Sequence, residues 1–471
     1  MADQISPLES IDGDSSVDPY TVKSGGVLTP PLTLLRRLKY LGPSVIVSGS
    51  IVGSGEIILT SSLGAAAGFS LLWWVLMSCW IKSLVQAELA RYTIVTGDTY
   101  LRALNRLPGK LWGPKGKVGW PIWLVLLAFI PGIMGLGGIM GGAGQALSLL
   151  FPVIDSRVAA MLVALTTIGI LNFGGYQRFE KILLGLVIVF TTTTLICAIT
   201  MQFTEFSISW SDIGSGFTFD LPVEYIGLAL AVYGYTGVNS GETAAYTYWC
   251  IEKGYPTFIG PRRDDEPEYA AWLARARGWI KVLHMDVWLT LIILTCATLP
   301  FYLLGAGVLH TLGETPDGLD TISILSGMFT RTLGNWALWV FGIGAFFILF
   351  STTLSAIGAG GRFLPDYFIE LGFFSRKNLK TRLAFIRGYV TVAPLLGCGL
   401  YMGVQNPVTL VTIGGLVAAL MLPIQSGGTL WLQRKHMDQR LTPHPFARTM
   451  LWLIFLFQLL MSMLVIQYVV F

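Results

Sequence analysis

The sequence predicts an all-α polytopic membrane protein made of two inverted five-helix repeats and an eleventh helix, with helices 1 and 6 broken. Three observations lead to this fold class: apolar runs of spanning length, cationic residues confined to alternate loops, and matching interruptions in spans 1 and 6. Of 471 residues, 53% are hydrophobic and only 12% are charged, whereas roughly 25% are charged in a soluble domain. This composition excludes a disordered chain, a secreted disulfide scaffold and a nucleic-acid-binding protein.

Eleven apolar runs are long enough to cross a bilayer, which takes about 20 helical residues. They cover residues 41–66, 69–92, 120–150, 157–174, 181–202, 223–250, 279–308, 334–361, 383–402, 406–432 and 448–470. The residues before them are polar. The predicted units are a flexible cytoplasmic tail (1–35), a first inverted repeat with helices 1–5 (36–202), a second repeat with helices 6–10 (203–432), and helix 11 (433–471).

Lysine and arginine positions set the predicted orientation, because membrane proteins concentrate these residues in cytoplasmic loops. With a cytoplasmic N-terminus, 28 of the 31 cationic residues lie on the inner side. Arg157 and Arg331 lie outside, Lys82 lies within a span, and the outer loops are acidic. We therefore expect a multi-pass plasma-membrane protein whose N-terminus is cytoplasmic and whose C-terminus is outside. We expect the protein to contact the lipid bilayer and not to bind nucleic acid. The sequence does not predict its oligomeric state.

The cysteines and histidines carry no recognisable chemistry. Five cysteines show no CxxC spacing, and four histidines form no ligand-like cluster, so neither a zinc site nor a disulfide framework is indicated. No acid/base dyad, phosphate loop or nucleophile motif is present. The sequence therefore predicts neither an enzyme nor a bound cofactor.

Spans 1 and 6 each carry a small-residue turn followed by a carboxylate at mid-span. Span 1 contains Gly53-Ser54-Gly55-Glu56, and span 6 contains Asn239-Ser240-Gly241-Glu242. Glycines weaken a helix, and a charge at the bilayer centre costs about 2.5–3.5 kcal/mol on insertion scales. Because the two spans occupy corresponding places in inverted repeats, the pattern indicates a transporter that binds its substrate between two broken helices.

The stretch from Gly42 to Gly97 resembles the first two helices of the Nramp divalent-metal transporters. The resemblance rests on Gly42-Pro43, Gly68-Phe69-Ser70-Leu71-Leu72-Trp73, Gln86, Arg91 and Ile94-Val95-Thr96-Gly97, and Leu422-Pro423 in span 10 also fits. The eleven spans and the inside N-terminus agree with that family. The resemblance implies the LeuT-type fold and transport of a divalent metal.

The chain departs from the family pattern at the metal site. Family helix 1 carries D-P-G-N where this chain has Gly53-Ser54-Gly55-Glu56, and family helix 6 carries M-P-H where this chain has Val238-Asn239-Ser240. The acidic proton-pathway residues of family helix 3 have no counterpart in span 3. In these respects the chain is similar to the Nramp-related magnesium transporters, which also lack the methionine and the proton machinery.

Oxygen ligands suit Mg²⁺ and Mn²⁺, whereas thioether sulfur selects softer metals. We therefore expect transport of Mg²⁺ and/or Mn²⁺ into the cytoplasm by alternating access, without proton coupling, with the cation as substrate. The predicted binding residues are Ser50, Gly53, Glu56, Tyr235, Val238, Asn239 and Glu242.

One alternative keeps the fold and changes the substrate. Gly53-Ser54-Gly55 also resembles the G-S-G turn with which amino-acid transporters of this fold bind a carboxylate, so a small organic substrate with metal transport lost is the second hypothesis. Lys82 is a possible countercharge to Glu56 or Glu242, a stand-in for a coupling cation, or a side chain that extends to the interface. Asp286 is a possible exit-path residue.

Overall fold

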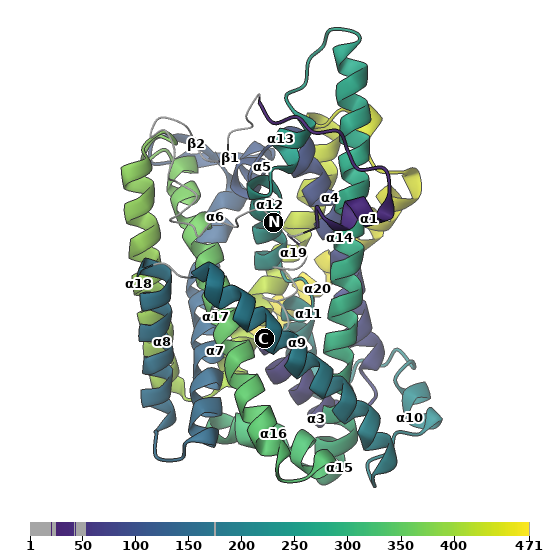
Figure 1. Ribbon diagram of the computed structural model, residues 1–471, viewed down its shortest axis with the longest axis vertical. Coiled ribbons are helices and arrows are strands. Elements are labelled where there is room, and N and C mark those ends of the chain that lie inside the picture. The colour runs from purple at the N-terminus through teal and green to yellow at the C-terminus, as the bar shows by residue number, and fades with distance from the viewer. Residues whose placement is uncertain (1–19, 21–24, 42, 44–52, 174–175, 471) are drawn as a thin grey trace.

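The computed structural model describes residues 20, 25–41, 43, 53–173 and 176–470. These residues form a helical bundle with one small β-hairpin (Figure 1). The helices of the first half are α1 (Leu34–Leu38), the π-helical turn η2 (Gly55–Thr60), α3 (Ser61–Ala67), α4 (Leu72–Thr96), α5 (Tyr100–Arg106), α6 (Trp120–Leu127), α7 (Phe129–Leu150), α8 (Ser156–Phe173), α9 (Tyr176–Thr200) and α10 (Trp210–Ser215).

The second half starts with a helix in two pieces. Its helices are α11 (Ile226–Tyr235), α12 (Ser240–Glu252), α13 (Tyr255–Ile259), α14 (Glu268–Leu304), the π-helical turn η5 (Gly305–Leu309), α15 (His310–Leu312), α16 (Thr321–Leu333), α17 (Ala337–Glu370), α18 (Leu379–Val404), α19 (Pro407–His436) and α20 (Pro445–Val470). Short 3₁₀ turns connect some of them: η3 (Met201–Phe203), η4 (Val223–Tyr225), η6 (Gly318–Asp320) and η7 (Gln439–Leu441).

Eight helices among the described residues are long and apolar enough to cross a membrane. The other three predicted spans differ for identifiable reasons. Helix α4 contains three charged residues, Lys82, Glu88 and Arg91, and span 6 is divided into α11 and α12. The first part of span 1, residues 44–52, lies outside the described residues. The predicted all-α membrane fold is confirmed, while the division of the chain into the four predicted units stays a prediction.

The two ends of the bundle differ in charge. The loops after α4, α12, α17 and α19, together with α5 and the antiparallel hairpin of β1 (Lys110–Gly113) and β2 (Gly116–Gly119), lie at the upper end in Figure 1. This end, called the basic end below, carries most of the loop lysines and arginines. Helices α10, α15 and α16 lie at the opposite, acidic end with Asp212 and Glu314. The loops after α4, α12, α17 and α19, which the sequence places on one side of the membrane, therefore lie at one end of the molecule.

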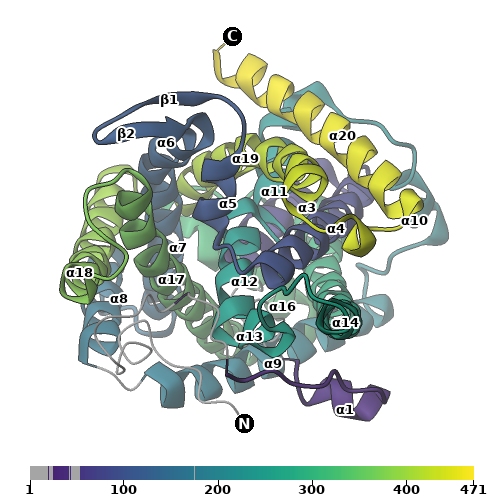
Figure 2. The ribbon, with the colours of Figure 1, turned by 90° about the horizontal axis from the view of Figure 1, so that it is seen from above.

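Glycines let the helices around α7 approach closely. A Cβ added to Gly137 would lie 2.5 Å from the carbonyl oxygen of Gly397 on α18, and a Cβ on Gly135 would lie 3.3 Å from the Cα of Gly414 on α19. Small residues at such crossings are typical of membrane helices. Seen from above, α12 lies near the centre of the bundle and α20 lies at its periphery (Figure 2). The half-helix α12 is therefore surrounded by the helices that form the candidate site.

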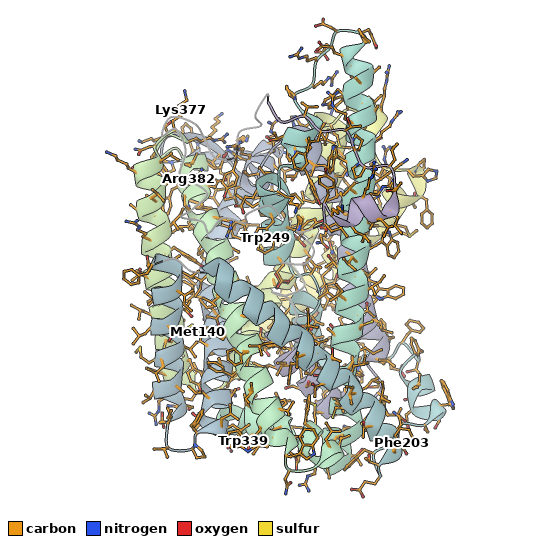
Figure 3. The ribbon with its side chains drawn as sticks, in the orientation of Figure 1. Met140, Phe203, Trp249, Trp339, Lys377 and Arg382 are labelled. Atoms are coloured by element: carbon orange, nitrogen blue, oxygen red, sulfur yellow. The ribbon has the colours of Figure 1, made fainter. Side chains whose placement is uncertain are left out.

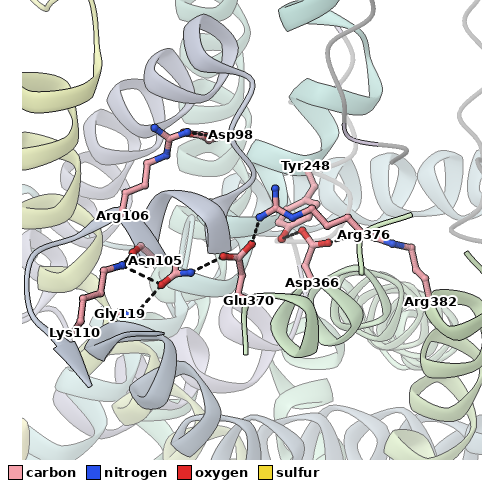
Figure 4. Close-up of polar contacts among 10 residues, drawn as sticks. All are labelled: Asp98, Asn105, Arg106, Lys110, Gly119, Tyr248, Asp366, Glu370, Arg376 and Arg382. Carbon is pink, nitrogen blue, oxygen red and sulfur yellow. Dashed lines mark hydrogen bonds and ion pairs between the residues drawn. The ribbon is translucent and has the colours of Figure 1, made fainter. Parts of the chain in front are cut away.

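A polar network fastens the elements of the basic end (Figure 4). Arg382 of α18 donates to Asp366 of α17 at 2.6 Å, and the Tyr248 hydroxyl of α12 donates to the same carboxylate at 3.0 Å. Glu370 accepts from the Asn105 amide of α5 at 2.6 Å and also pairs with Arg376. Because buried charges are tolerated only when they are paired and hydrogen-bonded, this network fixes α12 against α17 and α18.

The start of the seventh span differs from its prediction. The sequence predicts this span at 279–308. Instead, α14 runs without interruption from Glu268 to Leu304. A helix does not have to end at the membrane surface, so hydropathy alone could not locate its start.

Candidate functional site

The interruption of span 6 is a sharp backbone turn between α11 and α12. Gly237 has a φ of +70°, a conformation that costs an L-residue with a Cβ roughly 1–2 kcal/mol. A Cβ at this position would also lie 3.0 Å from the Cα of Cys79 on α4. Glycine is therefore required both by the turn and by the close approach of α4.

Helix α12 and the described start of span 1 share one part of a helix cap, a carboxylate that accepts from the amide three residues earlier. The Asn239 side chain accepts from the Glu242 amide at 2.9 Å, and the Glu242 carboxylate accepts from the Asn239 amide at 3.1 Å. This reciprocal arrangement is a capping box, which satisfies amides that the first helical turn leaves unpaired. In span 1, Glu56 likewise accepts from the Gly53 amide at 3.1 Å. The repeated Ser-Gly-Glu pattern is therefore a helix-start signal in both spans.

Glu56 also connects the start of η2 to the break of helix 6. Besides Gly53, its carboxylate accepts from the Gly237 amide at 3.2 Å and from the Thr298 hydroxyl of α14 at 3.3 Å. The residue is fully buried. A second tie is the 2.9 Å contact between the hydroxyls of Thr60 and Thr236. Glu56 therefore holds the start of η2, the break of helix 6 and α14 together.

Lys82 lies on the other side of the helix 6 break. Its ammonium donates to the carbonyl oxygen of Tyr233 at 2.6 Å and also to that of Thr236, at the C-terminal end of α11. The side chain is completely buried. Because the ammonium is buried against backbone carbonyls, the predicted extension to the interface is wrong. A countercharge role toward Glu56 or Glu242 stays a prediction.

A cavity of about 270 Å³ begins at the helix 6 break and extends toward the basic end. Glu242, Asn239 and Tyr235 lie at the break, and Tyr100 of α5 and Tyr389 of α18 lie farther toward that end. Trp249, near the middle of the bundle in Figure 3, is also part of the wall. Among the described residues of the wall, Glu242 is the one that carries a charge.

The predicted site residues fall into three groups in space. Glu242, Asn239 and Tyr235 line the cavity, together with Ser54, Ser240, Thr352 and Ser355, which the sequence prediction did not include. Gly53, Glu56, Val238 and Lys82 belong to the break but are not part of the described cavity wall. Ser50 lies outside the described residues. The two carboxylates thus do not share the cavity, although the sequence treats them alike.

Asp286 lies away from the cavity wall. It is fully buried on α14 and accepts from the Tyr246 hydroxyl of α12 at 2.7 Å. Through this hydrogen bond Asp286 fastens α12 to α14. The sequence alone does not reveal this contact. A role on an exit path therefore stays a prediction.

The described residues contain no group of three or more His, Cys, Asp or Glu side chains placed to hold a metal ion. Among the described residues of the wall, a cation in the cavity would meet one carboxylate and neutral oxygens, including the Asn239 amide and the Ser240 hydroxyl. Mg²⁺ is commonly held through one or two carboxylates while it keeps several waters. The donor set therefore fits a hydrated cation better than a fully dehydrated one.

Comparison with known proteins identifies the family. The family model Nramp, described as "Natural resistance-associated macrophage protein-like", matches residues 44–468. The chain belongs to the Nramp family. An uncharacterized protein of Pasteurella multocida, PM0681, is 23% identical over 381 residues, covering 78% of each chain. The divalent metal cation transporter MntH of Caldanaerobacter subterraneus is 31% identical over 163 residues, covering 34% of this Nramp chain and 36% of MntH.

Solved structures confirm the LeuT-type fold of this Nramp protein. A manganese transporter of Eremococcus coleocola superposes with a TM-score of 0.62 at 17% identity, over 94% of this chain and 89% of the transporter. The transporter MhsT, solved with L-phenylalanine, superposes with a TM-score of 0.51 at 16% identity, over 94% and 99% of the two chains. At these identities the comparison establishes the shared fold.

Proposed function

We propose that this Nramp protein carries a hydrated divalent cation, Mg²⁺ or Mn²⁺, across the plasma membrane by alternating access. The observation that carries this proposal is the charge of the cavity: its described wall contains a single charged side chain, and that side chain is the carboxylate of Glu242. A negative group in a low-dielectric cavity attracts cations and excludes anions. The names of MntH and of the Eremococcus coleocola transporter, which refer to divalent metal and to manganese, support the same substrate class.

The oxygen-rich lining favours hard cations. Ser54, Asn239, Ser240 and Ser355 offer hydroxyl or amide oxygens beside Glu242, and such ligands suit Mg²⁺ and Mn²⁺. A water molecule occupies roughly 30 Å³ in the liquid, so a cavity of about 270 Å³ is large enough for a cation with its first hydration shell. We therefore place the cation beside Glu242, with water completing its coordination.

We also propose that the cation moves into the cytoplasm, from the charge of the two ends. We assign the basic end to the cytoplasm, because loops rich in lysine and arginine stay on that side. The cavity then opens inward, and the acidic end, where Glu205 and Asp212 line a second cavity of about 410 Å³, faces outward and concentrates cations. Helix α7 has no charged residue in its sequence FIPGIMGLGGIMGGAGQALSLL, which supports uptake without a proton relay.

The test is uptake of Mg²⁺ and Mn²⁺ into proteoliposomes that also contain a pH-sensitive dye. We expect wild-type flux without acidification, and at least tenfold lower flux for Glu242→Gln. The matched control is Glu266→Gln, which removes an exposed loop carboxylate outside the cavity. Equal flux for Glu242→Gln and the control would contradict the proposal, and acidification that follows metal entry would contradict uncoupled transport.

A second candidate function is transport of a small organic molecule such as an amino acid. It is favoured by the apolar part of the cavity wall, where Phe129, Ile133 and Met421 lie, and by the start of α12, because a helix N-terminus attracts anionic groups. Glu242 already occupies that terminus with its own carboxylate, which makes the site less suited to a second one. Saturable uptake of amino acids by the same proteoliposomes, without metal flux, would decide for this candidate.

A further inference from the structure

Lys82 is an unusual residue, because a fully buried lysine normally has an acidic partner. Its ammonium instead contacts the carbonyl oxygens of Tyr233 and Thr236 and lies 5.4 Å from the centre of the Tyr233 ring. Both carbonyls belong to the end of α11, where the last turn of a helix leaves oxygens without an intrahelical donor. This end of a helix also carries the negative pole of its dipole.

One peptide group joins Lys82 to Glu56. The carbonyl of Thr236 accepts from Lys82, and the amide of Gly237, which belongs to the same peptide group, donates to Glu56 at 3.2 Å. The peptide is trans, so its carbonyl and its N–H point in opposite directions. The positive and the negative side chain therefore lie on opposite sides of one peptide, each at the pole that attracts it.

Such an arrangement strengthens both hydrogen bonds. An ammonium on the carbonyl polarises the peptide, so that its N–H becomes a better donor to the carboxylate, and in a low dielectric these effects are cooperative. The peptide concerned is the one that forms the break of helix 6. The two charges thus stabilise the break conformation together, although they do not touch.

We propose that Lys82 is a tethered cation that, paired with Glu56 through the Thr236–Gly237 peptide, holds the helix 6 break in its shape. The carbonyl end of α11 is then permanently occupied and takes no monovalent cation from solution. This inference rests on the proposed function, because a permanently bound ammonium would explain why the proposed transport needs no coupling ion. Its test measures unfolding rather than flux, so the two proposals can fail separately.

The first experiment replaces the tethered cation with a free one. Lys82→Ala removes a fragment that corresponds to n-propylammonium. We expect the purified full-length variant to unfold at a lower temperature than wild type and to regain at least half of the loss with n-propylammonium, but not with tetraethylammonium at equal ionic strength. Wild type and the control Lys377→Ala, which removes an exposed lysine (Figure 3), are expected not to respond. A loss that no small cation reverses would overturn the tethered-cation role.

The second experiment tests the link through the peptide and does not depend on Lys82→Ala folding. Lys82→Met keeps most of the side-chain length, and Glu56→Gln keeps the shape of the carboxylate. In a double-mutant cycle the Lys82→Met/Glu56→Gln protein is expected to lose clearly less stability than the sum of the two single losses. Additive losses would overturn the peptide-bridged pair, whatever n-propylammonium does.

Discussion

The two Ser-Gly-Glu segments differ in what surrounds the same local structure. Glu56 and Glu242 each accept from the amide three residues earlier, Glu56 at the start of η2 and Glu242 at the start of α12. Glu56 is then covered completely and accepts two further hydrogen bonds, from Gly237 and Thr298, whereas Glu242 lies in the wall of the cavity. The comparison shows that one repeated motif can have a fully buried carboxylate in one place and a carboxylate in a cavity wall in the other.

The strongest test of this difference is the stability of Glu56→Ala. The substitution leaves the amides of Gly53 and Gly237 buried without an acceptor, and each unsatisfied donor costs about 1–3 kcal/mol. We expect a loss of about 2–6 kcal/mol in the free energy of unfolding, measured by denaturant titration in detergent. A loss below about 1 kcal/mol would show that Glu56 does not hold η2 to the break of helix 6.

Gly237→Ala tests the turn itself. The φ of +70° and the 3.0 Å approach of a Cβ to Cys79 predict a loss of about 2 kcal/mol, with the cavity end of α12 displaced. The control is Gly185→Ala on α9, where a Cβ would meet nothing within 4 Å. Equal unfolding temperatures for the two variants would contradict the requirement for glycine at 237.

Asn239→Ala removes half of the capping box of α12. Loss of an N-cap side chain costs typically about 1 kcal/mol, and Asn239→Ser is expected to recover most of it, because serine is also a good N-cap. Thermal unfolding of the three proteins gives the comparison. A serine variant no more stable than the alanine variant would mean that the cap does not stabilise α12.

Glu242→Gln tests the second carboxylate of the comparison, the one in the cavity wall. A glutamine at this place still accepts from the Asn239 amide, so the stability change should stay below about 1 kcal/mol, the usual contribution of a charge at a helix end. Cation flux should nevertheless fall at least tenfold. The opposite outcome, an unstable protein with normal flux, would assign Glu242 the structural role and leave the cavity without its charge.

Much of the fold is predictable from the sequence because hydropathy and charge act over whole segments. The spans predicted at 120–150 and 157–174 correspond to α6 with α7 and to α8. The interruption of span 6 is predicted at Asn239-Ser240-Gly241-Glu242, whereas the turn lies just before it, at Gly237, and Ser240 to Glu242 already belong to α12. The hairpin of β1 and β2 is not predicted, although the Gly-Pro-Lys-Gly turn at its tip is a recognisable turn signal.

The site is predictable only in part, because its geometry depends on contacts between distant segments. The capping box of Asn239 and Glu242 has a spacing that the sequence displays, and it is the signal that the sequence analysis missed. That Glu56 is buried and Glu242 lines the cavity depends on the positions of α14 and α4, which no local pattern encodes. The contact between Lys82 and the carbonyl of Thr236 joins residues 154 positions apart.

The peptide between Thr236 and Gly237 has a consequence for how this lineage can vary. Lys82 and Glu56 lie on different helices and never touch, yet loss of either charge leaves its opposite buried without compensation, which is strongly destabilising. Close relatives of this chain should therefore either retain both residues or have replaced both, with glycine kept at 237 in each case. A pair of positions linked in this manner would be recognised in an alignment only by coordinated replacement, since no side-chain contact would explain it.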